Sequence, residues 1–128
     1  MVKTVSLLTM REKKLLVVLS KKHTLWTPPS GKINPTDSNP SSALIREVWE
    51  GLGVSLKNMK EYLGFGGISA SGQPVYVDTF LADIEGRPMP ANEIKEIRWI
   101  GCSEEELKAV SPVTKDIMLC MQADGYLS

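Results

Sequence analysis

The stretch GKINPTDSNPSSALIREVWEGLGV, from Gly31 to Val54, is the part of the chain that decides the fold. Its first part is a polar loop. Asn39 and Pro40 then supply residues that favour a helix start, with an amide side chain at the cap and a proline in the first turn. Apolar residues recur at every fourth position and form one stripe: Leu44, Val48 and Leu52. Because Gly53 suits a C-terminal cap, the stretch predicts a loop followed by an amphipathic helix.

Two glutamates on this predicted helix, Glu47 and Glu50, are three residues apart and therefore share a face. Arg46 precedes Glu50 by four residues, and we expect it to hold that carboxylate in place. Backbone carbonyls of the upstream loop can complete a set of oxygen ligands, which suits Mg²⁺ or Mn²⁺. The alternative is a solvated helix face with ion pairs along the helix, and the two glutamates alone leave it open.

Short apolar runs on either side of the helix predict strands. The first two runs, 4–8 and 15–20, are expected to form a hairpin across the polar turn 11–14. Three more strands are expected after the helix, at 62–68, 75–84 and 94–100. A closing helix is expected to begin at Ser111-Pro112 and to end near Gly125. This order predicts an α/β (α+β) protein with a mixed sheet and helices packed on it.

The composition is typical of a soluble globular protein, with 42% hydrophobic and 23% charged residues in a chain of 128. This length predicts a single domain over 1–128. The longest apolar run, 15–19, is too short to span a bilayer, and no signal peptide is visible. Cys102 and Cys120 form no metal motif and are expected to be reduced. We therefore expect a cytoplasmic protein that does not enter the membrane.

Charge is distributed unevenly, although the net charge is zero. Residues 1–32 contain seven basic residues and one acid, whereas 33–128 contain the other eight basic and fourteen acidic residues. A basic segment facing acidic groups suits an anionic ligand held beside carboxylates that carry a cation. Ordinary solvated lysines are the alternative. No nucleic-acid surface is expected, because the chain lacks net positive charge and a cluster of stacking aromatic residues.

The loop and helix together resemble the Nudix box, G-x5-E-x7-R-E-U-x-E-E-x-G-U, in which U is a bulky aliphatic residue. Seven residues fall on its fixed positions: Gly31, Arg46, Glu47, Val48, Glu50, Gly53 and Val54. The flanking strands, a segment with Glu93 and Trp99, and the closing helix extend the resemblance over nearly the whole chain. The resemblance implies the Nudix fold, a mixed β-sheet sandwiched between α-helices.

The chain departs from the Nudix box at two places and from the residues before the box at one. Asp37 and Arg46 enclose eight residues instead of seven, and the acid there is Asp instead of Glu. Gly51 stands where the box has a second glutamate, and by resemblance this removes a metal ligand. Ser30 stands where the family's P-G-G-K segment has a glycine.

The resemblance implies a Mg²⁺-dependent pyrophosphohydrolase, with Mn²⁺ as an alternative ion. Such an enzyme would cleave a nucleoside diphosphate linked to another group, such as a nucleoside triphosphate, to a monophosphate. The implied metal ligands are the Ser30 backbone carbonyl, Glu47, Glu50 and Glu96. For the ligand outside the helix, Glu96 is favoured over Glu93. The alternative for Glu96 is a solvated acid at the end of a sheet. Asp37 is a more distant substitute for this ligand. Arg46 would orient the glutamates, and Glu47 or Glu96 would be the base.

The resemblance also suggests substrate contacts. Lys32, Arg11 and Lys22 could meet phosphate oxygens. Groups that could stack or pack on the substrate are His23, Trp26, Tyr76 and Phe80, although Trp26 and Phe80 are more typical of the core. Trp49 and Trp99 are expected to pack as structural residues.

Gly51 supports an alternative function, a degenerate Nudix domain that binds a nucleotide-like ligand with little or no hydrolysis. Restoring Glu at this position would separate the two hypotheses. The expected partner is a small nucleotide or nucleotide conjugate, whose identity no motif specifies. A homodimer is compatible with the resemblance, but no exposed apolar segment in the sequence establishes one.

Overall fold

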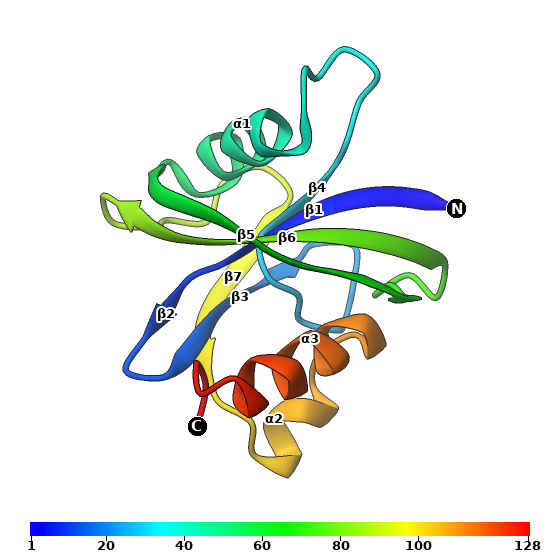
Figure 1. Ribbon diagram of the computed structural model, residues 1–128, viewed down its shortest axis with the longest axis vertical. Coiled ribbons are helices and arrows are strands. Elements are labelled where there is room, and N and C mark those ends of the chain that lie inside the picture. The colour runs from blue at the N-terminus through cyan, green and yellow to red at the C-terminus, as the bar shows by residue number, and fades with distance from the viewer.

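Two β-sheets lie at the centre of the molecule, and helices cover them on opposite sides (Figure 1). The computed structural model describes residues 1–128. The mixed sheet has the strand order β4-β1-β6-β5 and consists of β1 (Val2–Leu8), β4 (Ser30–Lys32), β5 (Ser55–Ile68) and β6 (Pro74–Glu85). The antiparallel sheet has the order β2-β3-β7 and consists of β2 (Met10–Arg11), β3 (Lys14–Ser20) and β7 (Ile94–Ile100). The predicted mixed sheet between helices is confirmed.

The first helix, α1 (Pro40–Leu52), forms as predicted. The Asn39 side chain accepts a hydrogen bond of 2.9 Å from the Ser42 amide, and Gly53 caps the other end with φ at 68°. On the far side of the sheets lie α3 (Pro112–Ala123) and the short α2 (Glu104–Lys108). Helix α2 was not predicted, because its five residues include no fully buried side chain and show no apolar periodicity. No helix has both the length and the apolarity needed to cross a membrane.

Two apolar cores hold the layers together. The core beneath α1 includes the predicted stripe of Leu44, Val48 and Leu52. The core beneath α3 includes Val113 and Ile117. Strand β6 supplies both cores, because its side chains alternate between the two faces of the sheet. Its residues on the α3 side are Val75, Val77 and Leu81, and those on the α1 side are Phe80 and Ala82.

The predicted hairpin between residues 4–8 and 15–20 is wrong. Strand β1 pairs with β4 and, in parallel, with β6, whereas β3 pairs with β2 and β7. The hairpin joins β2 to β3, and its turn residues Glu12 and Lys13 both have positive φ, at 52° and 59°. Strand β1 is a central strand whose second half is buried, and a central strand needs a partner on each side. The local turn signal could not supply those distant partners.

The loop between β6 and β7 covers the C-terminal end of α1. Its Met89 and Ala91 amides and its Asn92 side chain donate hydrogen bonds of 3.1, 3.0 and 2.7 Å to helix carbonyls. The Gly53 amide donates to a fourth carbonyl at 3.0 Å. The four acceptors are the last carbonyls of the helix: Trp49, Glu50, Gly51 and Leu52. All free acceptors at this helix end are thus satisfied, and the start of β7 is fixed beside the acidic face of α1.

Candidate functional site

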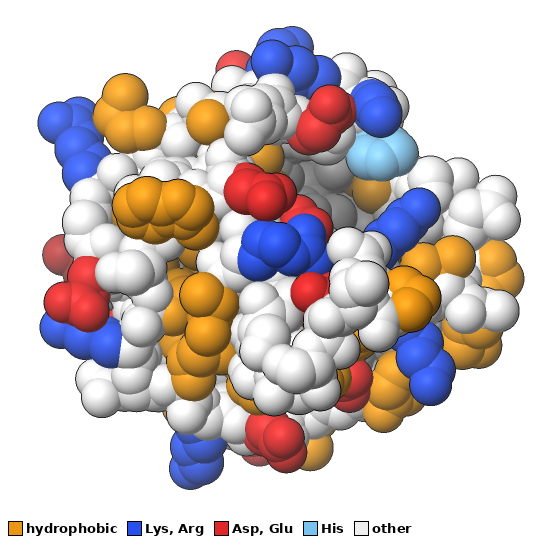
Figure 2. All heavy atoms as spheres, turned by 90° about the horizontal axis from the view of Figure 1, so that it is seen from above, with side chains coloured by type: hydrophobic (Ala, Val, Ile, Leu, Met, Phe, Trp, Pro, Cys, Tyr) orange, Lys and Arg blue, Asp and Glu red, His pale blue; other side chains and the backbone are white.

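A cavity of about 450 Å³ opens where the ends of both sheets meet one face of α1 and the start of α3. Its walls come from β1 and β6, the end of β3, the loop through β4, the turn between β5 and β6, and the segment entering β7. Figure 2 shows a hollowed face with acidic and basic side chains gathered around it. Segments far apart in the chain therefore build one site.

Three carboxylates line the cavity, Glu47 and Glu50 from α1 and Glu93 from just before β7. The predicted acid Glu96 is not among them. Its carboxylate lies 4.0 Å from the Arg98 guanidinium, and both side chains are half exposed. Because a strand rises about 3.3 Å per residue, Glu96 lies about 10 Å further along the chain than Glu93. The cavity wall therefore includes Glu93 in place of the predicted Glu96, a difference that depends on where the loop before β7 docks on α1.

Glu47 is held by a chain of polar contacts from the loop before the helix. The Asn34 amide donates to Asp37 Oδ2 at 2.7 Å, and Arg46 Nη2 lies 3.0 Å from the same oxygen. Arg46 Nη1 then lies 2.9 Å from Glu47 Oε1. The Asn34 amide and the Arg46 guanidinium hold the pKa of Asp37 below its ordinary value. The contact with Asp37, followed by that with Glu47, raises the pKa of Arg46.

The predicted pairing of Arg46 with Glu50 is wrong. Spacing along the helix permits it, but Asp37 and Glu47 occupy the two ends of the guanidinium. Asp37 therefore has a structural role. It contacts Arg46, Arg46 contacts Glu47, and of these three residues Glu47 lines the cavity. The Glu50 side chain is exposed and makes no ion pair.

Two glycines decide how closely the acidic face of α1 can be approached. A Cβ at Gly31 would overlap the side chain of Glu47, so glycine at this position lets Glu47 lie directly against the loop backbone next to Ser30. A Cβ at Gly51 would lie 2.8 Å from the Cδ1 atom of Ile94. The space at Gly51 is therefore occupied by an apolar side chain. The sequence carried no sign of this contact, because Ile94 comes from a distant strand.

The carboxylates suit a divalent cation that arrives with phosphate. No three acidic, His or Cys side chains in the structure form a group that could hold a metal by themselves. Mg²⁺ does not need such a cage, since it commonly takes one or two protein carboxylates, several waters and substrate phosphates. Glu47 and Glu50, together with the nearby Ser30 backbone, offer this kind of oxygen donor set. The residues present fit Mg²⁺ shared with a diphosphate.

Only one of the three predicted phosphate contacts lines the cavity, Lys32. The Lys22 ammonium lies 3.7 Å from Glu93 Oε2 on the exposed surface and does not line the cavity. The Arg11 guanidinium lies 4.6 Å from the centre of the Trp99 ring, outside the cavity. Arg11 lies in β2, which forms a hairpin with β3, whereas the sequence predicted a hairpin between residues 4–8 and 15–20.

The predicted aromatic contacts are also placed elsewhere. Phe80 is 7% exposed and lies in the core beneath α1. Tyr76 lies on the face of β6 opposite the cavity-lining Val75 and Val77, because side chains alternate along a strand. Trp26 is buried, with the Arg98 guanidinium 4.7 Å from its ring centre, and only His23 of this predicted set lines the cavity.

The two tryptophans expected to pack have different surroundings. Trp99 packs against the core beneath α1, as expected. Trp49 is 62% exposed on the outer face of α1, and its predicted packing role is wrong. The helix has more apolar residues than its buried face can accommodate, and the sequence does not show which of them stay exposed to solvent.

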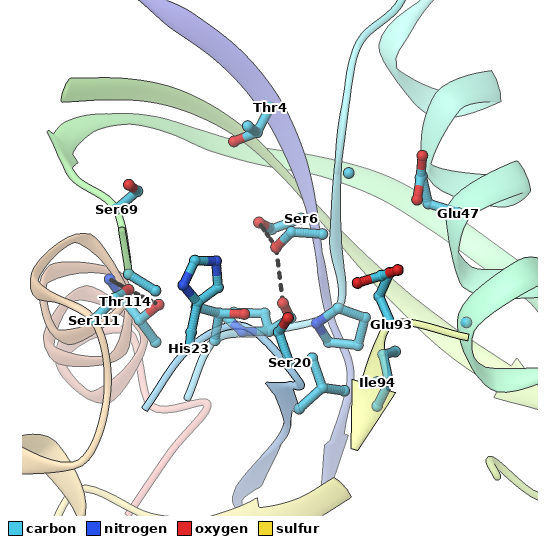
Figure 3. A pocket seen from close by; sticks show the side chains of 18 of the residues that line it. Thr4, Ser6, Ser20, His23, Glu47, Ser69, Glu93, Ile94, Ser111 and Thr114 are labelled. Carbon is cyan, nitrogen blue, oxygen red and sulfur yellow. Dashed lines mark hydrogen bonds between the residues drawn. The ribbon is translucent and has the colours of Figure 1, made fainter. Parts of the chain in front are cut away.

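Hydroxyl side chains form much of the remaining cavity wall, and no motif in the sequence points to them. We call this set the hydroxyl wall: Thr4, Ser6, Ser20, Thr27, Ser30, Ser69, Ser71, Ser111 and Thr114. Figure 3 shows His23 between the Ser69, Ser111 and Thr114 side of the cavity and the Glu47 and Glu93 side. The cavity therefore has an acidic end and a hydroxyl-rich end.

Comparison with known proteins connects this site to one family. A sequence model described as NUDIX domain matches residues 2–119. The fold is similar to a NUDIX hydrolase from Nitrosomonas europaea, with a TM-score of 0.79 and 19% identity over 96% of this chain and 89% of that chain. For a MutT NUDIX hydrolase from Burkholderia pseudomallei, the TM-score is 0.75 at 19% identity over 92% of this chain and 95% of that chain.

A third similar structure is an Ap4A hydrolase from C. elegans, with a TM-score of 0.74 and 21% identity over 97% of each chain. A search of curated proteins finds no match. At these identities the structural likeness concerns the fold alone, and the family assignment rests on the matching sequence model.

Proposed function

The chain belongs to the Nudix hydrolase family, and from this membership we propose that it hydrolyses a diphosphate bond in a nucleotide or nucleotide conjugate. The products would include a monophosphate. One observation carries the proposal: Glu47, Glu50, Glu93 and Lys32 line the same cavity. Carboxylates that carry a cation and an ammonium that binds phosphate oxygens are the groups this reaction needs.

Mg²⁺, or Mn²⁺ in its place, is the proposed cofactor. Glu47 and Glu50 would hold it, together with the Ser30 backbone carbonyl and phosphate oxygens of the substrate. When bound, the ion polarises the phosphorus–oxygen bonds and offsets the charge that develops on the phosphate. Affinity for the ion alone should be weak, because Gly51 contributes no carboxylate.

The chain's own residues supply positioning and a base. Arg46 donates a hydrogen bond to Oε1 of Glu47 and fixes the orientation of that carboxylate. Lys32 binds a phosphate oxygen and draws the diphosphate toward the acidic end. We assign the base to Glu93, whose carboxylate would accept the proton of the attacking water. Glu47 is less suited to this step, because it would hold the cation.

Binding of a nucleotide-like ligand without efficient hydrolysis is a second candidate function, and the contact of Ile94 with Gly51 favours it. Gly51 supplies no carboxylate and the Ile94 methyl group takes the space beside it, so a cation meets one negative charge fewer than the box provides. The two candidates share the cavity and differ in turnover.

Hydrolysis of a broad panel of nucleotides and nucleotide conjugates by the purified protein tests the proposal, with Mg²⁺ and then Mn²⁺. Glu47→Gln and Glu93→Gln should each lower kcat by at least about 100-fold, because general-base and metal contacts carry effects of this size. Glu96→Gln is the matched control, since Glu96 lies near the same strand start but outside the cavity, and it should retain activity.

Three outcomes are distinct. Turnover that Glu47→Gln and Glu93→Gln abolish and Glu96→Gln leaves intact supports the proposed enzyme. Turnover equally lost in Glu96→Gln would contradict the placement of the base. No turnover on any compound, with a thermal shift on adding nucleotides, would support the binding module in its place.

A further inference from the structure

The proposed base and metal ligands do not include His23, the only histidine of the chain, although it lines the same cavity. Its side chain is half-buried, and its ring has no hydrogen-bond or ion-pair partner within the protein. Figure 3 shows the ring inside the cavity, between the acidic end and the hydroxyl-rich end. A polar ring without a protein partner is available to a ligand that enters the cavity.

The turn that carries His23 is docked on the segment that carries the proposed base, Glu93. The His23 amide donates to the Ser20 carbonyl at 3.2 Å, which closes the turn after β3, and the Lys21 amide donates to the Glu93 carbonyl at 2.8 Å. Next to this turn, β3 pairs with β7, and Ser20 lies opposite Ile94. These contacts hold the backbone of His23 in a fixed position relative to that of Glu93.

The cavity lining contains three side chains with nitrogen donors, Lys32, Asn92 and His23. Asn92 already donates to a carbonyl at the end of α1 at 2.7 Å. Lys32 follows Gly31, which lies against Glu47, so its backbone belongs to the acidic end. An imidazole offers at least one N–H donor whether it is neutral or protonated. His23 is therefore the nitrogen donor on the side of the cavity away from the acidic end.

Hydrolysis of a diphosphate uses two opposite sides of the reacting phosphorus atom. The attacking water and the departing oxygen lie roughly in line through the phosphorus. Because the proposed cation and base lie at the acidic end, the water attacks from the Glu93 side and the departing phosphate group points away from it. Figure 3 shows the His23 ring on that other side of the cavity.

We propose that the His23 ring donates a hydrogen bond to the departing phosphate group, as a further catalytic residue of the reaction. This inference rests on the proposed function. The water oxygen forms a bond to phosphorus, the bridging phosphorus–oxygen bond breaks, and a proton of the water passes to Glu93. The departing phosphate group keeps the electron pair of the broken bond, and the His23 N–H stabilises the negative charge that develops on its oxygen.

Two substitutions separate the donor from the ring. His23→Phe keeps an aromatic ring without the donor, and because the charge develops only in the transition state, it should lower kcat at least about tenfold with little change in KM. His23→Gln keeps a donor without the ring and should stay within about threefold of wild type, since its amide still donates a hydrogen bond. The substrate is the compound of the panel that the wild-type protein hydrolyses fastest. Thr24→Ala, next in the chain and outside the cavity, is the control.

Each other pattern of activity contradicts the donor role. Full activity in His23→Phe with a loss in His23→Gln would make the ring a stacking surface. Equal losses in both variants would also overturn the donor role, because the glutamine amide keeps a donor that phenylalanine lacks. Wild-type activity in both would show that His23 takes no part. Melting temperatures of the variants show whether the fold is retained.

A second measurement observes His23 without turnover. Because the chain has one histidine, the imidazole signals of a proton–nitrogen correlation spectrum belong to His23. The wild-type protein with Mg²⁺ is titrated with methylenediphosphonate, a diphosphate analogue whose carbon bridge resists hydrolysis. The imidazole signals and the Gly31 amide signal should shift together, with one dissociation constant. A shift at Gly31 without a shift of the imidazole would overturn the contact between His23 and phosphate.

The inference and the proposed function can fail separately. If the wild-type protein hydrolyses no compound of the panel while the imidazole signals still shift with the diphosphonate, the proposed hydrolase is wrong and the phosphate contact of His23 stands. If Glu47→Gln and Glu93→Gln abolish hydrolysis while His23→Phe leaves it unchanged, the hydrolase stands and the catalytic role of His23 is overturned.

Discussion

The two ends of the acidic face of α1 are built in different ways. At the Glu47 end, Asp37 holds Arg46, Arg46 holds Glu47, and Gly31 leaves room for the side chain. At the Glu50 end, the carboxylate has no ion pair, and Ile94 fills the space beside Gly51. Glu47 is therefore a preorganised carboxylate, whereas no ion pair fixes the carboxylate of Glu50. Function should therefore depend much more on the supports of Glu47 than on the surroundings of Glu50.

Gly31→Ala should have the largest effect. The new Cβ would overlap Glu47 and push its carboxylate away from the loop. Displacement by about 1 Å can cost about 100-fold in rate, and we expect kcat/KM to fall by that factor. Steady-state hydrolysis measures it. Gly66→Ala is the control, because a Cβ at that glycine meets nothing within 4 Å and should change neither activity nor melting temperature. Full activity in Gly31→Ala would show that Glu47 does not need its present place.

Asp37→Asn should have the next largest effect, because it removes the support of Arg46 rather than a group in the cavity. We expect about a tenfold fall in kcat, the lower end of the range for residues that orient a metal ligand. KM should change little, and Asp116→Asn, on the exposed face of α3, is the control. A wild-type kcat in Asp37→Asn would mean that Arg46 keeps Glu47 in place by itself.

The same variant should show a pH-dependent stability. The pKa of Asp37 is lowered in the folded protein from an ordinary value of 3.8, so the folded state favours the ionised carboxylate. Its contribution to stability is complete above that value and is lost as the pH falls through the lower folded pKa. The melting temperatures of wild type and Asp37→Asn should differ at pH 7, and the difference should shrink as the pH falls below 3.8. A difference that stays constant over this range would contradict the ion pair.

How much of the two ends of this helix face could be predicted from the sequence depends on how far apart in the chain the contacting residues are. Asn39, Pro40 and Gly53 fix the ends of α1 through their own backbone neighbours, and the helix was therefore predictable. The proximity of Glu47 and Glu50 also follows from helix geometry alone. The box positions, read as a resemblance, placed Ser30, Gly31 and Lys32 beside the same helix face.

The rest of the site depends on contacts between distant segments. Glu93 lines the cavity and Glu96 does not, and the segment is anchored by the Asn92 side chain, which donates to the Glu50 carbonyl at the end of α1. Ile94, the first residue of β7, fills the space at Gly51. Neither contact leaves a periodic pattern, because each depends on where a loop docks. For the same reason, the partners of β1 could not be predicted from the turn that follows it.

The Glu50 end can be changed toward the Glu47 end by Gly51→Glu combined with Ile94→Ala. The second substitution clears the space that the new side chain needs, and an added carboxylate should raise Mn²⁺ affinity about tenfold. Gly51→Glu alone should give a smaller gain, since the Ile94 side chain must first move. Titration of Mn²⁺ followed by electron paramagnetic resonance measures both, with Ile94→Ala alone as the control. An equal gain in the single and double variants would show that Ile94 is no obstacle.

Gly51→Ala should have the smallest effect and isolates the contact from the charge. Alanine in a helix interior is about 0.5–1 kcal/mol more stable than glycine. Against this gain stands the approach of the new Cβ to Ile94 Cδ1, at 2.8 Å, which a rotation of that flexible side chain relieves at some cost. The two terms nearly cancel, and we expect the free energy of unfolding to change by less than about 0.5 kcal/mol. Urea unfolding of Gly51→Ala, with and without Ile94→Val, measures the balance. A stabilisation close to the full helix-propensity gain would show that Ile94 moves freely, and the Glu50 end would then be open to a larger side chain at no cost.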